Sequence, residues 1–70
     1  MKQPNHVARN ARIAKGYTQK QVASMLSMTV RSYQRFEHGE RNLSTDKLFR
    51  LAEILGVSVY ELVGKESQAV

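Results

Sequence analysis

The stretch TQKQVASMLSMTVRSYQRFEHG, residues 18–39, decides the fold of this chain. It reads as two short helices joined by a tight turn. Thr18, with Gln21 three residues later, forms a capping box that marks the start of the first helix. The turn falls at Ser27, and Thr29 is a suitable N-cap for the second helix. The second helix has apolar side chains on one side and two arginines on the other.

At 100° per residue, the helix over 29–37 has two distinct sides. We expect the side toward the core to hold Thr29, Tyr33 and Phe36. The outer side holds Val30, Arg31, Gln34 and Arg35. A polar outer side is ordinary for a surface helix. Two arginines and a β-branched residue directly after a short turn are more informative, because they indicate a side that contacts another molecule.

The rest of the chain is also helical in pattern. Leu48, Leu51, Ala52 and Leu55 recur at i, i+3, i+4 and i+7, which is the strongest helical periodicity in the sequence. No useful stretch alternates apolar and polar residues as a strand would. We predict one all-α domain over residues 1–70, a compact five-helix bundle. The helices are expected at about 5–15, 18–26, 29–37, 45–55 and 58–63, with a tail at 64–70. Either Gln3 or Asn5 caps the first of them.

The charge of the chain is unevenly distributed. Its formal net charge is +5. Residues 1–41 carry eight Lys or Arg against two Glu, whereas residues 42–70 carry three against four acidic residues. A basic part beside a near-neutral part is the electrostatic footprint of a protein that meets phosphates. Charge alone leaves open the alternative of a basic domain with no special partner.

Several function classes are disfavoured. The sequence has no cysteine, which excludes disulfides and thiolate metal sites and fits a cytoplasmic protein. No apolar run approaches the ~18 residues of a membrane span, and there is no secretory signal. His6 and His38 stand apart from any catalytic set, and no glycine-rich phosphate loop or metal-ligand cluster is present. We expect no enzymatic activity, no metal and no cofactor.

Five motifs together resemble the Cro/C1-type (XRE) helix-turn-helix family, the DNA-binding domains of phage repressors and many bacterial regulators. In chain order they are GYTQ at 16–19, VA at 22–23, FEHG at 36–39, Leu48 with LA at 51–52, and LGVS at 55–58. The resemblance covers about residues 5–63. It implies a lambda repressor-like domain whose helix over 29–37 enters the major groove of double-stranded DNA.

The chain departs from the family pattern at two positions. Ser27 stands where the family usually has glycine, at a turn position of positive φ that costs a non-glycine residue ~1 kcal/mol. Tyr33 stands where the family has a small aliphatic residue. We expect its ring to pack inward and its hydroxyl to lie at the edge of the core, within reach of a phosphate.

The resemblance implies which residues touch DNA. Val30 would contact a thymine methyl group, and Arg31 and Arg35 would pair with guanine O6 and N7. Contact with a phosphate is the alternative for both arginines, and Gln34 could contact either a base or the backbone. The expected base-reading residues are Val30, Arg31, Gln34 and Arg35. The expected phosphate-binding residues are Thr18, Gln19, Ser32, His38, Arg41 and Asn42.

The family also implies a structural ion pair and a dimer. Arg12 and Glu37 match a largely buried salt bridge between the first helix and the end of the third. The expected dimer contacts are Val57, Val59, Tyr60 and Val63, although Val59 and Val63 could instead close the core. We expect a homodimer, formed either in solution or only on DNA, because one helix reads too few base pairs for a unique site.

The function that follows is a sequence-specific transcriptional regulator. A repressor at a palindromic operator is the first interpretation, since blocking polymerase needs no further surface. The second is the antitoxin of a toxin–antitoxin pair, which would bind a toxin and repress its own operon.

Overall fold

The computed structural model describes residues 3–63, and in that range it contains five α-helices and no strand. The helices are α1 (His6–Lys15), α2 (Gln19–Met25), α3 (Val30–Glu37), α4 (Thr45–Leu55) and α5 (Val59–Val63). The predicted all-α fold class is confirmed. The predicted tail at 64–70 lies outside the described residues. None of the five helices is long and apolar enough to cross a lipid bilayer.

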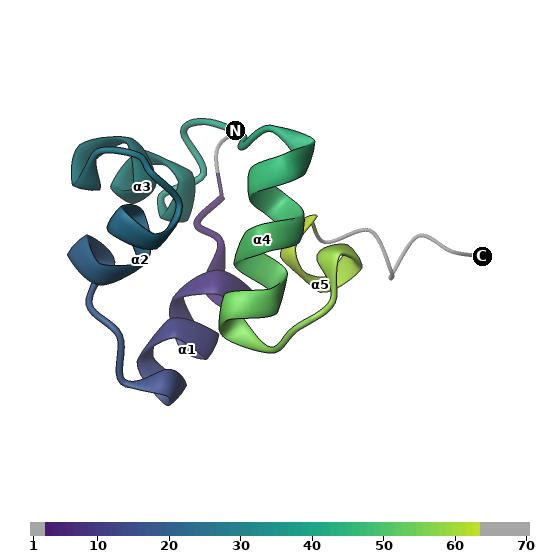
Figure 1. Cartoon of the computed structure of the whole chain (residues 1–70). Coiled ribbons are helices and arrows are strands. Elements are labelled where there is room, and N and C mark those ends of the chain that lie inside the picture. The colour runs from purple at the N-terminus through teal and green to yellow at the C-terminus, as the bar shows by residue number, and fades with distance from the viewer. Residues whose placement is uncertain (1–2, 64–70) are drawn as a thin grey trace.

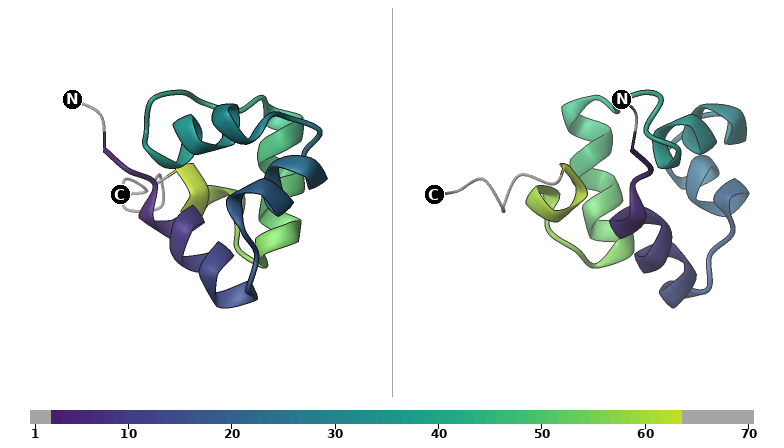
Figure 2. Two further views of the ribbon diagram at one scale, coloured as in Figure 1. Left: turned by 90° about the vertical axis from the view of Figure 1, so that its left-hand side faces the viewer. Right: turned by 180° about the vertical axis from the view of Figure 1, so that it is seen from behind.

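The five helices form two groups that share α1. Figure 1 shows α2 and α3 on one side of the molecule and α4 and α5 on the other. α2 packs against α3, α4 packs against α5, and α1 contacts α3, α4 and α5. The view from behind shows the same division (Figure 2, right). α3 is therefore held by its neighbours from one side.

The core draws apolar residues from all five helices. Tyr33 of α3 and Leu51 of α4 are completely buried, and Leu62 of α5 is buried as well. Ala23 of α2 is also buried, and its small side chain lets α3 approach closely. The other buried apolar residues are Ala8, Val22, Leu26, Phe36, Leu43, Ala52 and Leu55. Burial on this scale, in a chain this short, stabilises the fold only modestly.

Four helices begin one residue later than predicted, because the predicted ranges included the capping residue, which is not itself helical. Asn5, and not Gln3, caps α1: its side-chain oxygen accepts a hydrogen bond of 3.0 Å from the Ala8 N–H. The Asn5 side-chain amide donates to the Leu62 carbonyl at 2.8 Å, and its backbone N–H donates to the Glu37 carbonyl at 2.7 Å. One residue thus ties the start of α1 to α5 and to the end of α3.

The turn between α2 and α3 has the geometry expected of it. Ser27 has φ +56°, so a serine occupies the left-handed region that favours glycine. Lys47 of α4 donates a hydrogen bond of 2.8 Å to the Leu26 carbonyl at the end of α2. This bond satisfies a carbonyl that the helix itself leaves without a partner, and it fixes the turn against α4.

Two predictions about α3 are wrong. Thr29 is exposed and does not face the core, because it is the N-cap and lies outside the helical periodicity; its hydroxyl accepts from the Ser32 N–H at 3.1 Å. The Tyr33 hydroxyl does not lie at the edge of the core. It is buried with its ring and has no hydrogen-bond partner of normal geometry among the described residues. A phosphate on the surface is therefore out of its reach.

Candidate nucleic-acid interface

The outer side of α3 is open to solvent. Val30 is 38% exposed, the Arg35 side chain is 54% exposed, and Arg31 is also exposed. Gln34 lies between them and is half-buried. Thr29 caps the helix directly before these residues, so its first turn, which carries Val30 and Arg31, is regular. The structure thus brings the four predicted base-reading residues together on one accessible side of one helix.

Arg35 has an acidic neighbour. Its Nε lies 3.6 Å from Glu40 Oε1, and the Glu40 side chain is 40% exposed. An exposed pair at this distance contributes little to stability and is screened by salt. The contact uses the Nε edge of the guanidinium, so the two terminal nitrogens remain available to a ligand.

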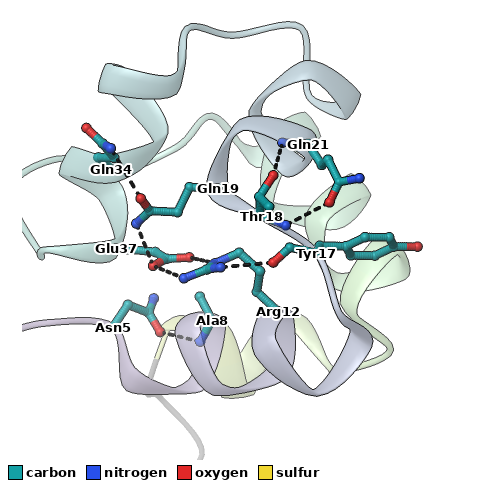
Figure 3. Close-up of polar contacts among 9 residues, drawn as sticks. All are labelled: Asn5, Ala8, Arg12, Tyr17, Thr18, Gln19, Gln21, Gln34 and Glu37. Atoms are coloured by element: carbon teal, nitrogen blue, oxygen red, sulfur yellow. Dashed lines mark hydrogen bonds and ion pairs between the residues drawn. The ribbon is translucent and has the colours of Figure 1, made fainter.

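Behind the outer side of α3, an ion pair joins this helix to α1. Arg12 Nε lies 2.7 Å from Glu37 Oε2, and Arg12 Nη2 donates to Glu37 Oε1 at 3.3 Å (Figure 3). The third guanidinium nitrogen, Nη1, donates to the Tyr17 carbonyl at 2.9 Å. The Arg12 side chain is 11% exposed and that of Glu37 is 2% exposed. This two-bond geometry holds the end of α3 rigidly against α1.

The pair shifts the pKa values of the groups around it. Burial alone would raise the pKa of Glu37, but hydrogen bonds to its carboxylate, led by that from Arg12, outweigh burial and lower it. The hydrogen bond to Glu37 raises the pKa of Arg12. Burial raises the pKa of Tyr33, and the nearby Glu37 carboxylate adds to the effect. Glu37 is therefore a carboxylate, and Tyr33 a neutral phenol, at neutral pH.

Two glutamines, Gln19 and Gln34, connect the Arg12–Glu37 ion pair to the surface of the molecule. The Gln19 side chain, at the start of α2, donates from Nε2 to Glu37 Oε1 at 3.1 Å. Gln34 Nε2 in turn donates to Gln19 Oε1 at 3.2 Å. Figure 3 shows the three side chains in line, from the buried Glu37 carboxylate through Gln19 to Gln34. Sequence reasoning missed this contact, because residues 15 positions apart on different helices give no periodic signal.

Comparison with known proteins identifies the family of this chain. The sequence profile of the helix-turn-helix family matches residues 9–62. The chain belongs to the Cro/C1-type helix-turn-helix family. The restriction-modification controller protein C.AhdI from Aeromonas hydrophila has a similar crystal structure, with 31% sequence identity and a TM-score of 0.68. The similarity covers 79% of this chain and 83% of that chain. No curated protein sequence matches this chain significantly.

Membership of the Cro/C1-type family and the controller-protein neighbour together support a DNA-binding transcriptional regulator. The fold of this family member also places the residues predicted to bind phosphate. They lie at the start of α2, on α3 and in the segment after it. Thr18 is the exposed N-cap of α2, and its oxygen accepts from the Gln21 N–H. His38 is the exposed C-cap of α3. Ser32 is half-buried on α3, and Arg41 and Asn42 are exposed beyond it.

The residues predicted at a dimer contact separate into two pairs. Val57 and Val59 are partly buried and pack against the core. Tyr60 is 68% exposed and Val63 is 39% exposed. Phe49 of α4, which sequence reasoning did not single out, is 58% exposed. Its position in the strongly periodic α4, off the apolar stripe, was the signal that could have identified it.

Proposed function

We propose that this protein is a sequence-specific repressor that inserts α3 into the major groove of a palindromic operator. The outer side of α3 carries the proposal, because Val30, Arg31 and Arg35 are exposed there while the opposite side of the helix is buried. The major groove of B-DNA admits one α-helix, and the N-terminal residues of a recognition helix meet the base edges.

Each residue on this side of α3 contacts a different group of the DNA. Arg31, in the first turn, pairs with O6 and N7 of a guanine, and Val30 beside it contacts a thymine methyl group. Arg35, one turn later, offers its terminal nitrogens to a second guanine. The proposed phosphate contacts set the register of the helix in the groove without reading sequence. They are made by Thr18, Ser32, His38, Arg41 and Asn42, and by Gln19 through its backbone N–H at the start of α2.

Two copies of the chain bind together in this proposal. A single recognition helix reads few base pairs, so two copies on half-sites about one DNA turn apart (~34 Å) are needed for a unique operator. Tyr60 and Val63 are the exposed apolar residues of α5 that support a contact between the copies. A dimer at a promoter represses by covering it, which needs no further surface.

The similarity to a restriction-modification controller protein supports a regulatory role for this chain. Control of a restriction–modification operon is accordingly the first regulatory context to test. The antitoxin interpretation stays a prediction that no comparison tests, and it requires a protein partner in addition to DNA.

Selection of bound duplexes from a random pool tests the proposed function. We expect the wild-type chain to enrich an inverted repeat whose half-sites contain a guanine. The Arg31→Ala variant should relax the preference at one base pair of each half-site. Enrichment of no motif, or enrichment of a motif that Arg31→Ala leaves unchanged, would refute the proposal.

A further inference from the structure

A chain of hydrogen bonds begins at the Glu37 carboxylate, which can only accept them. Glu37 is ionised and 2% exposed, and Arg12 already fixes its position. A carboxylate has no N–H or O–H to donate. Gln19, whose side-chain amide lies 3.1 Å from Glu37 Oε1, must therefore turn its NH2 group toward Glu37. Its carbonyl oxygen then faces away from Glu37.

The orientation of Gln34 is fixed in the same way by Gln19. The carbonyl oxygen of Gln19 also only accepts, so Gln34 must turn its own NH2 group toward it, at 3.2 Å. The carbonyl oxygen of Gln34 points away from Gln19 in consequence (Figure 3). A surface glutamine normally rotates between two amide orientations of similar energy. Here the buried carboxylate selects one of them.

This orientation decides what Gln34 presents on the outer side of α3. One N–H of Gln34 is used by Gln19. The carbonyl oxygen and the second N–H remain, and they form one acceptor and one donor side by side. In the major groove, adenine shows the complementary pair, a donor at N6 and an acceptor at N7. Guanine shows two acceptors and cytosine a single donor, so neither matches both groups.

We propose that Glu37, acting through Gln19, orients Gln34 to read an adenine in the operator. Gln19 is then a positioning residue, and its side chain acts on the DNA through Gln34. This inference rests on the proposed function, because it requires α3 in the major groove. It also differs from a phosphate contact by the Gln19 side chain, which would strengthen binding to all sequences alike.

Competition binding to the selected operator tests the inference. Each of the four base pairs is placed in turn at the position whose preference depends on Gln34. That position is the one at which Gln34→Ala relaxes the wild-type preference. We expect wild type to favour adenine there by roughly 5- to 100-fold, the range for a bidentate contact. Gln19→Met removes the relay with little change in size, and we expect the adenine preference to fall several-fold. Preferences at the other positions should stay unchanged.

Two controls keep the result specific. Gln21→Met removes a similar amide, which bonds the Thr18 N–H within α2, and should leave the adenine preference intact. Gln34→Glu, which keeps an acceptor but loses the donor, should shift the preference from adenine toward cytosine. In the Gln34→Ala background, Gln19→Met should have no further effect on preference at that position.

Equal loss of affinity for all duplexes in Gln19→Met would overturn the inference and assign the Gln19 side chain to a phosphate. An unchanged adenine preference in that variant would overturn it as well, as would an unchanged preference in Gln34→Glu. In each of these results, wild type still selects an operator. If the proposed function itself fails, wild type enriches no motif, and the inference fails with it.

Discussion

Arg12 of α1 donates two hydrogen bonds to the Glu37 carboxylate of α3, from Nε at 2.7 Å and from Nη2 at 3.3 Å. Both side chains are largely removed from solvent. A buried pair of this kind need not add net stability compared with apolar residues, but the loss of one partner leaves an uncompensated charge. The orientation of α3 against the rest of the domain therefore depends on a contact that is costly to break.

Glu37→Gln should lower the free energy of unfolding by about 3–5 kcal/mol, because Arg12 is left buried without its counter-charge. Denaturant unfolding at neutral pH measures the change. Glu40→Gln is the matched control: it breaks the exposed contact with Arg35 and should cost less than about 1 kcal/mol. Equal losses in the two variants would contradict the structural role of the buried pair.

Acid should destabilise the domain through Glu37. The pKa of Glu37 is lowered in the folded state from the ordinary value of 4.5, so the unfolded state takes up a proton first as pH falls. The contribution of Glu37 to the free energy of unfolding is full above that value. It is lost as the pH falls from 4.5 toward the pKa of the folded state.

The difference in stability between wild type and Glu37→Gln isolates this contribution from that of the other carboxylates. It should shrink as unfolding is measured from about pH 6 down to about pH 3. A difference that stays constant over this range would show that Glu37 has an ordinary pKa.

Tyr33→Phe should leave the free energy of unfolding unchanged or raise it by up to about 1 kcal/mol. The variant removes a buried hydroxyl that has no hydrogen-bond partner of normal geometry among residues 3–63, while the ring packing against Phe36 is kept. DNA affinity should not change, since the hydroxyl lies inside the core. A loss of more than about 1.5 kcal/mol would show that the hydroxyl bonds the Glu37 carboxylate.

Ser27→Gly should raise the free energy of unfolding by about 0.5–1 kcal/mol, because glycine adopts the φ of +56° at this turn without strain. Gly16→Ala is the opposite test. Gly16 has φ +79° with open space around it, so added strain alone should destabilise that variant by about 1 kcal/mol. Thermal unfolding of both variants checks the pair, and a stabilised Gly16→Ala would contradict the account.

The fold could be predicted from the sequence because its signals are local. Capping residues such as Thr18 and Ser44 mark the helix starts, and Gly16 and Gly56 mark helix ends through positive φ. The periodicity of α4 gave its buried side. The burial of the Tyr33 hydroxyl could not be predicted in this way, because it depends on how closely α3 packs against α1 and α2.

The candidate site was predicted only in part, for a similar reason. Helical geometry alone put Val30, Arg31, Gln34 and Arg35 on one side of α3, and all are exposed or half-buried there. The hydrogen bonds that Gln34 donates to Gln19 and that Gln19 donates to Glu37 join different helices. They follow from tertiary packing, which residue spacing does not encode.

We propose above all that Arg31 reads a guanine through the major groove. The direct measurement is a binding cycle with wild type and Arg31→Ala on the selected operator, with and without 7-deazaguanine at the guanine assigned to Arg31. This base lacks the N7 acceptor of the major groove and leaves the minor groove unchanged. The analogue should weaken wild-type binding by roughly 5-fold or more and have little effect on binding by Arg31→Ala. Equal binding of wild type to both duplexes would contradict it.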